Sequence, residues 1–177
     1  IIFAAAGDVT AAHRAGCRYL DTLYRKPIPQ RTDIVLVSQG GAPKDLNLYQ
    51  TQKALDNAKH AVRPGGIIIL IGSCKEGLGE RCFERWIQEA TCSHDLIDRV
   101  QTHFELGGHK AAAIAMVLEN ARIFLVSEMA PELVRKCFLE PYSSAQKALD
   151  DAFAILGSNA TVLAMPYGGS TLPIVEQ

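Results

Sequence analysis

The sequence predicts an α/β fold, a three-layer Rossmann-like domain in which helices flank a mostly parallel sheet. Short apolar runs alternate with longer segments of helical periodicity, which is typical of β-α-β units with right-handed crossovers. The run 67–71 is apolar at every position, as expected for a parallel strand buried on both faces. A chain of 177 residues has about the length of one domain. We therefore expect residues 1–177 to form a single α/β domain.

The periodicity places the elements in order along the chain. Pro27 ends the first helix, residues 63–66 (Arg-Pro-Gly-Gly) form a sharp turn, and Gly157 closes the last helix. Residues 1–8 are interpreted as a strand that ends in a turn. Helices are predicted at 9–24, 47–62, 80–90, 94–103, 109–120, 131–137 and 143–156, and strands at 33–37, 67–71, 122–126 and 161–165.

Composition and charge exclude several classes of protein. The 18 Lys and Arg against 19 Asp and Glu give a net charge of −1, so there is no electrostatic reason to expect nucleic acid or an anionic membrane as a partner. The hydrophobic fraction of 48% and the charged fraction of 21% are those of a folded domain. No apolar run approaches the ~20 residues that span a bilayer. Because the sequence opens at Ile1 without a Met, we expect it to be part of a longer chain.

The cysteines indicate a reducing compartment. Their number is odd and no two have C-x-x-C spacing, so neither a disulfide framework nor a structural zinc site is expected. Scattered reduced thiols fit a cytoplasmic protein. The five are Cys17, Cys74, Cys82, Cys92 and Cys137.

The first candidate site follows the strand 33–37. A glycine pair lets the backbone approach a ligand, and the helix after it offers free N–H groups and a positive dipole end. Gln50 and Lys53 share a face of that helix and suit a carboxylate or phosphate. The alternative is capping, because Asn47 and Gln50 have capping-box spacing. The candidate residues are Gly40, Gly41, Lys44, Asp45, Tyr49, Gln50 and Lys53.

The second candidate site is the pair His109 and Lys110. Two glycines deliver this pair to the start of a wholly apolar helix, which must be buried. His109 suits proton transfer near neutral pH, and Lys110 suits an anion. The alternative is a loop histidine beside a lysine whose stem lies along apolar surface.

The third candidate site is the loop 72–79, which contains Ser73 and Cys74. It lacks the G-K-[ST] ending of a P-loop and the G-x-G-x-x-G pattern. Cys74 is a nucleophile only with a base nearby; otherwise it is a small buried side chain.

The first candidate also carries a resemblance to a known family. The stretches 40–45 (GGAPKD), 47–50 (NLYQ) and 53–58 (KALDNA) resemble the nickel-dependent lactate racemase family. Residues 104–111 (FELGGHKA) support the resemblance. The similarity runs from about Ala6 to the end and covers only the family's C-terminal domain.

The resemblance implies a two-domain enzyme that racemises or epimerises 2-hydroxy acids. Its cofactor is a nickel pincer nucleotide tethered to a lysine, which takes a hydride from the substrate α-carbon and returns it. The acid–base histidine pair, the tethering lysine and the nickel-binding histidine belong to the family's N-terminal domain. The resemblance therefore implies no catalytic residue and no metal ligand in this chain, which alone would be inactive. Its partners would be a small 2-hydroxy acid and the N-terminal domain of the same protein.

The family's Y-Q-x-x-K element falls on Tyr49, Gln50 and Lys53, which the resemblance implies hold substrate or cofactor. One departure concerns specificity. Lactate-specific members have a tryptophan where this chain has Gly107-Gly108-His109-Lys110, and Trp86 lies in a different segment. We therefore expect a more polar pocket that suits a larger hydroxy acid, such as a sugar acid.

Two alternatives to the racemase remain. The turn 63–66 before the strand 67–71 is similar to the P-G-G turn of Rossmann-type methyltransferases, although no glycine-rich loop follows a first strand. The other alternative is a non-catalytic domain that binds a partner or completes a cleft.

Overall fold

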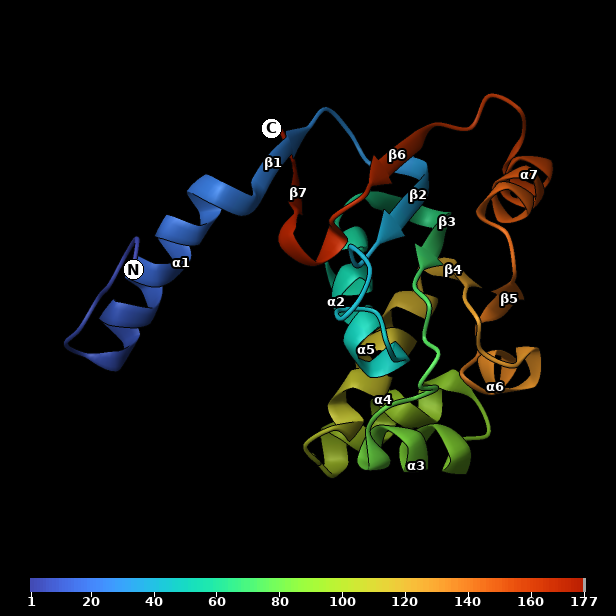
Figure 1. Cartoon of the computed structure of the whole chain (residues 1–177), viewed down its shortest axis with the longest axis horizontal. Helices are drawn as coiled ribbons and strands as arrows, with labels where there is room; N and C mark the ends of the chain where they lie inside the picture. The colour runs from blue at the N-terminus through green and yellow to red at the C-terminus, as the bar shows by residue number, and fades with distance from the viewer. Residues whose placement is uncertain (177) are drawn as a thin grey trace.

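The computed structural model describes residues 1–176, and its centre is a five-stranded sheet (Figure 1). The strand order is β5-β4-β3-β2-β6, and every neighbouring pair is parallel. The predicted fold class is thus confirmed. The strands are β2 (Thr32–Ser38), β3 (Val62–Ile71), β4 (Ala121–Val126), β5 (Glu140–Tyr142) and β6 (Val162–Met165).

Alternating side chains give this sheet two buried faces, because successive residues of a strand point to opposite sides. The helices are α1 (Val9–Tyr24), α2 (Leu48–Ala58), α3 (Arg81–Glu89), α4 (Ser93–Thr102), α5 (Gly108–Leu118), α6 (Pro131–Lys136) and α7 (Ala145–Leu156). Val35 and Leu70 belong to the core shared with α2 and α5, whereas Ile34 and Ile69 belong to the core shared with α7. The result is three layers.

The predicted boundaries hold for most elements and fail at one loop. The second helix ends at Ala58, four residues early, because β3 already begins at Val62. The predicted turn 63–66 lies inside that strand as an irregularity: Thr32 pairs with Val62, but Ile34 pairs with Ile67. Gly65 adopts a φ of 75° there, which glycine tolerates best.

Two short strands outside the central sheet were not predicted. They are β1 (Arg25–Ile28) and β7 (Leu172–Val175), which pair in parallel with each other. Ile28 and Val175 pack on the main core, so this ribbon attaches the carboxyl-terminal segment and the base of the α1 (Val9–Tyr24) arm to the sheet domain. The edge strand β5 of the central sheet was missed as well.

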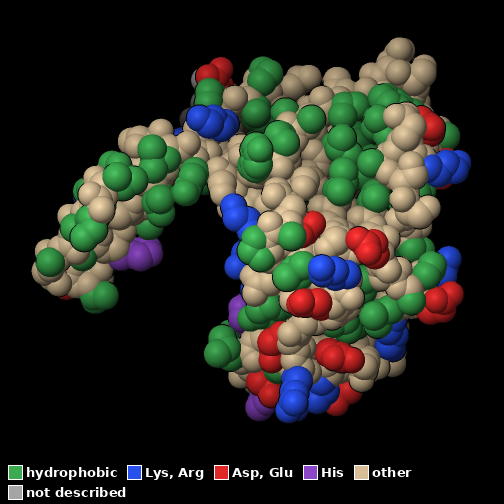
Figure 2. Space-filling model, in the orientation of Figure 1, with side chains coloured by type: hydrophobic (Ala, Val, Ile, Leu, Met, Phe, Trp, Pro, Cys, Tyr) green, Lys and Arg blue, Asp and Glu red, His purple; other side chains and the backbone are tan. Residues whose placement is uncertain are grey.

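The amino-terminal segment differs from the predicted strand. Residues 1–6 have no regular structure, and Asp8 caps α1 (Val9–Tyr24) by accepting a hydrogen bond from the Ala11 N–H. The interpretation of 1–8 as a strand is therefore wrong: no neighbouring strand pairs with it. Helix α1 projects from the body as an arm without a buried residue (Figure 1). Figure 2 shows hydrophobic side chains along this arm, and Val9, Leu20 and Leu23 of α1 are exposed.

Among the described residues, no helix combines the length and the apolar character that crossing a membrane requires.

Candidate functional site

A pocket of about 250 Å³ opens at the carboxyl end of β2. Ligands of parallel α/β sheets bind at this edge. Helix α2 follows β2, and the short 3₁₀ helix η1 (Gly168–Ser170) follows the neighbouring β6, so the two meet above the strand ends. The pocket is lined by Gln39, Lys44, Gln50, Lys53, Gly169 and Ser170. Three of these were predicted: Lys44, Gln50 and Lys53.

Capping and ligand binding do not exclude each other at the start of α2. Asn47 Oδ1 accepts the Gln50 backbone N–H at 3.0 Å, so the capping alternative is correct for Asn47. The Gln50 side chain is not used in the cap. Its Oε1 accepts from Lys53 Nζ at 2.6 Å, and this contact holds a neutral amide and a cation together at the pocket wall.

Lys110 reaches the same helix from α5. Its Nζ donates to the Tyr49 carbonyl at 3.0 Å and lies 4.2 Å from the centre of the Tyr49 ring. Burial, and then the nearby charge of Lys53, lower the pKa of Lys110. Two predicted candidates therefore meet: Lys110 and Lys53 both contribute positive charge beside Tyr49 and Gln50.

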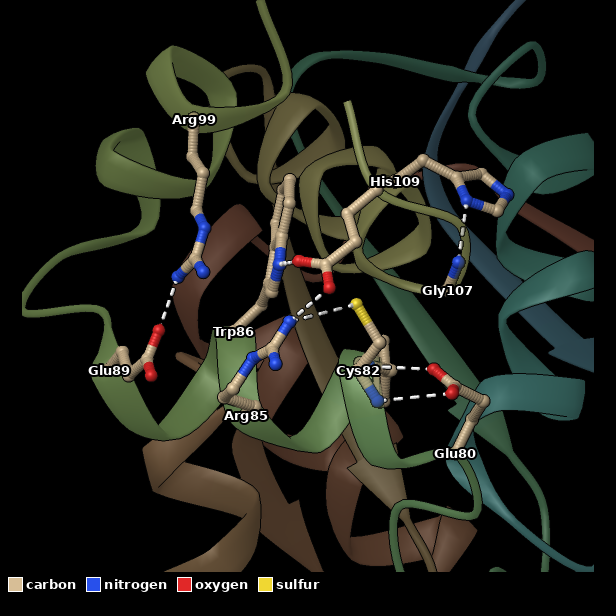
Figure 3. A network of polar contacts seen from close by, with 10 residues as sticks. Glu80, Cys82, Arg85, Trp86, Glu89, Arg99, Gly107 and His109 are labelled. Atoms are coloured by element: carbon tan, nitrogen blue, oxygen red, sulfur yellow. Dashed lines mark hydrogen bonds and ion pairs between the residues drawn. The ribbon is translucent and has the colours of Figure 1, made fainter. Parts of the chain in front are cut away.

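His109, in contrast, turns toward its own loop. Its Nδ1 accepts the Gly107 N–H at 3.2 Å (Figure 3), and its ring stacks on Phe104 with 5.7 Å between centroids. His109 is not among the residues that line the 250 Å³ pocket. The structure thus separates the two members of the predicted His109–Lys110 pair.

Trp86 packs beneath the segment that contains His109 and Lys110. The indole is fully buried, and its Nε1–H donates to Glu105 Oε2 at 2.9 Å (Figure 3). A Cβ on Gly108 would lie 2.3 Å from the ring, so only glycine fits against the indole. Arg99 covers the ring at 4.5 Å from its centroid. Trp86 therefore packs under the start of α5 and does not face the pocket.

Glu105 joins the tryptophan to the surface of α3. Its second carboxylate oxygen accepts from Arg85, and the two hydrogen bonds, from Arg85 and then Trp86, lower the pKa of Glu105 to about 2. The carboxylate stays charged near neutral pH and holds the loop before Gly107 against the α3 helix.

Hydrogen bonds connect the loop after β2 to the loop after β3 through Asp45, Ser73 and Cys74. Asp45 Oδ2 accepts the Ser73 N–H at 3.0 Å, and its carbonyl accepts the Cys74 N–H at 2.8 Å. Cys74 is 1% exposed and contacts Thr51 Oγ1 at 3.4 Å. Burial raises the pKa of the Cys74 thiol to about 11, so the structure favours the buried-thiol alternative over a nucleophile.

The glycine pair shapes the loop after β2, which also contains Asp45. Gly40 and Gly41 have φ angles of 100° and 78°, a region that favours glycine. A Cβ on Gly40 would lie 3.1 Å from the Tyr167 ring. The pair therefore lets the loop after β2 turn beneath Tyr167, toward Lys44 at the pocket.

Two lining side chains were not predicted. Gln39 is the first residue after β2 and Ser170 ends η1. Gln39 is 6% exposed, and its Oε1 has no hydrogen-bond partner among residues 1–176. A polar residue directly after a buried strand was the available signal for Gln39. Ser170 lies far away in sequence, and only the pairing of β2 with β6 brings it to the site.

Comparison with known sequences identifies the family to which the chain is similar. The model of the family described as "Lactate racemase C-terminal domain" matches residues 28–172. The chain is 29% identical to a lactate racemase of Thermoanaerobacterium thermosaccharolyticum over 180 aligned positions. It is 28% identical to one of Lactiplantibacillus plantarum over 173 positions. These alignments cover 97% and 95% of this chain and 41% of each relative, so the chain spans less than half the length of either.

Solved structures give the same picture. The lactate racemase apoprotein from T. thermosaccharolyticum superposes with a TM-score of 0.84 at 27% identity, over 94% of this chain and 40% of that one. A Thermotoga maritima protein shares the fold at a TM-score of 0.65 and 17% identity, over 94% of this chain and 42% of its own. Because the family model covers most of the sequence, the chain belongs to the lactate racemase C-terminal domain family.

Proposed function

We propose that this chain forms the substrate-holding half of a 2-hydroxy-acid racemase or epimerase. The observation that carries the proposal is the Lys53–Gln50 pair at the pocket wall. Lys53 donates to a neutral amide, and no carboxylate among residues 1–176 forms an ion pair with it. Its positive charge is therefore available to a substrate carboxylate, which Gln50 can orient by donating from its amide nitrogen.

The chemistry of the pocket fits an anion. Lys44 adds positive charge to the pocket lining, and Lys110, beside Tyr49, acts on Lys53 through its charge. Tyr49 positions Lys110 through its carbonyl and ring. In this proposal the chain binds and orients the carboxylate, and its partner across the cleft is the N-terminal domain expected in the same protein.

The cofactor proposed for the whole enzyme is the nickel pincer nucleotide. Its chemistry when bound is reversible hydride removal at the substrate α-carbon. Within residues 1–176 no three His, Cys, Asp or Glu side chains cluster as metal ligands. The donors present here suit the anionic parts of a substrate or nucleotide, and Lys44 and Lys53 would contact those parts. Nickel ligands and the acid–base pair are assigned in this proposal to the N-terminal domain.

The similarity of the chain to lactate racemases favours this function over a methyltransferase-like domain. A non-catalytic domain that completes a cleft describes the chain when it is isolated. The inactivity of the isolated chain and its cytoplasmic setting stay predictions from the sequence.

A racemisation assay tests the proposal. The full-length protein, loaded with cofactor, is expected to interconvert the enantiomers or epimers of a 2-hydroxy acid, whereas residues 1–177 alone are expected to be inactive. The substrates to compare are lactate and sugar acids. Turnover by the isolated chain, or no turnover of any 2-hydroxy acid by the full protein, would contradict the proposal.

A further inference from the structure

One part of the pocket lining is polar but uncharged, unlike the part that contains the lysines. Its residues are Gln39, Gly169 and Ser170. We propose that Gln39 and Ser170 form a subsite for hydroxyl groups on the substrate chain, so that the enzyme takes a polyhydroxylated 2-hydroxy acid in preference to lactate. This inference rests on the proposed function, because it assumes that Gln50 and Lys53 hold the carboxylate.

Gln39 is the observation that needs an explanation. It is 94% buried, yet its Oε1 has no partner among the described residues. Buried polar atoms are normally hydrogen-bonded, because losing water without a replacement is unfavourable. The oxygen itself is enclosed, but Gln39 is among the residues that line the pocket, so rotation of its terminal amide can bring the oxygen to a bound molecule.

Gly169 keeps the space around this amide free. A Cβ at Gly169 would lie 2.6 Å from Gln39 Oε1 and 2.7 Å from its Nε2. Any larger residue would press on both polar atoms. The terminal amide turns easily, because its last torsion is broad and two-fold, so either atom can face the pocket.

An amide and a hydroxyl complement each other. The Gln39 side chain offers an acceptor oxygen and two N–H donors, and the Ser170 hydroxyl both donates and accepts. Substrate hydroxyls likewise donate and accept, so they can satisfy both residues. A methyl group, as in lactate, can satisfy neither and would leave the amide without a partner.

The volume of the pocket also favours a substrate that is larger than lactate. Its volume of about 250 Å³ equals roughly eight water molecules at ~30 Å³ each. Lactate would leave much of this space empty. A longer acid that is bound at Lys53 by its carboxylate can extend toward Ser170 on η1.

The test compares three acids by calorimetric titration of the full-length, cofactor-loaded protein. D-gluconate carries the hydroxyls, 2-hydroxyhexanoate has the same chain length without them, and lactate is short. We expect gluconate to bind about tenfold or more tightly than 2-hydroxyhexanoate, since a site built for hydroxyls rejects analogues that lack them. Gln39→Leu should abolish this preference, and Ser170→Ala should reduce it. Gln88→Leu on the exposed face of α3 is the matched control and should retain it.

The outcomes separate the inference from the function on which it rests. Equal affinity for gluconate and 2-hydroxyhexanoate in the unaltered protein overturns the subsite. So does a preference that survives in both Gln39→Leu and Ser170→Ala. Ser170→Ala is an independent readout if Gln39→Leu fails to fold. If Lys53→Ala leaves the binding of all three acids unchanged, the proposed carboxylate site itself is wrong, whatever the two subsite variants show.

Discussion

Two pockets with basic side chains lie at opposite ends of the same sheet, and only one has the features of an anion site. The pocket at the carboxyl ends of the strands measures about 250 Å³ and contains Lys44 and Lys53. The pocket at the amino ends is larger, about 380 Å³, and contains Arg31 and Lys59. Neither volume nor the number of cations distinguishes the end at which we propose that the substrate binds.

The difference lies in the surroundings of the charges. Lys53 lies in the middle of α2 and donates to a neutral glutamine. Lys59 lies at the end of the same helix, where the carbonyl groups disfavour an anion, and its Nζ pairs with Asp56 at 2.9 Å. A basic pocket binds a carboxylate best where no carboxylate of the protein neutralises the cation and no helix carbonyl end faces the anion.

The largest effect is expected from removing the charge at one pocket or the other. Lys53→Ala should weaken binding of a 2-hydroxy acid by about 2–3 kcal/mol, the value of a hydrogen bond to a charged group. This corresponds to about 30-fold to about 160-fold in Kd. Lys59→Ala is the matched control on the same helix and should change Kd less than about twofold. Calorimetric titration of the full-length protein measures both, and equal losses would abolish the distinction between the pockets.

The comparison also depends on Lys110, which lies on α5 and contacts Tyr49 of α2. Gly108→Ala places a Cβ against the Trp86 indole, so we expect it to destabilise the fold by about 2 kcal/mol through overpacking. Gly16→Ala in α1, where a Cβ has nothing within 4 Å, should be neutral or slightly stabilising. Denaturant unfolding compares the two variants. Equal stabilities would show that the loop does not rest on Trp86.

The pH dependence of binding is expected to reveal Lys110. Its pKa is lowered by burial and by Lys53, so as pH rises Lys110 loses its charge earlier than an ordinary lysine does. Affinity for a carboxylate should fall in that pH range. Lys110→Met should bind about tenfold more weakly at neutral pH.

The affinities of Lys110→Met and the unaltered protein should converge as pH rises through the lowered pKa. Titrations at several pH values measure this convergence. A ratio of affinities that stays constant with pH would exclude Lys110 as the titrating charge.

The smallest effect concerns the support beneath α5. The pKa of Glu105 is lowered to about 2 by hydrogen bonds from Arg85 and Trp86, so its stabilisation is complete above the ordinary pKa of a glutamate and is lost as pH falls toward 2. Glu105→Gln should lower Tm modestly at neutral pH, with the difference vanishing in acid. Glu128→Gln, at an exposed position, should show no such convergence. Thermal unfolding at pH values from neutral to 2 measures the difference in Tm between each variant and the unaltered protein.

The strands that sequence analysis found and missed differ in one physical respect. The runs 33–37, 67–71, 122–126 and 161–165 are apolar and free of proline, and each forms a strand of the central sheet. The missed strands β1, β5 and β7 are three or four residues long, and each contains a proline. Proline removes a backbone donor and confines a strand to an edge. Local pattern favours a turn there, and only tertiary pairing forms the strand.

The candidate site shows a similar division. Gln50 and Lys53 were predicted because both lie on one helix face, where spacing alone brings them together. Gln39 and Ser170 are 131 positions apart and meet only through the parallel pairing of β2 with β6. Trp86 under Gly108 is likewise a contact between separate segments. Local spacing thus predicted the pair that we propose holds the carboxylate, and the topology added the rest of the pocket.

The most direct test of the central claim is to locate a bound 2-hydroxy carboxylate. Crystals of the full-length protein soaked with 3-bromolactate would mark the ligand by the anomalous signal of bromine. We predict a peak in the pocket of Gln50 and Lys53, with the carboxylate in contact with Lys53 Nζ. A peak in the pocket of Arg31 and Lys59, or none beside residues of this chain, would contradict it.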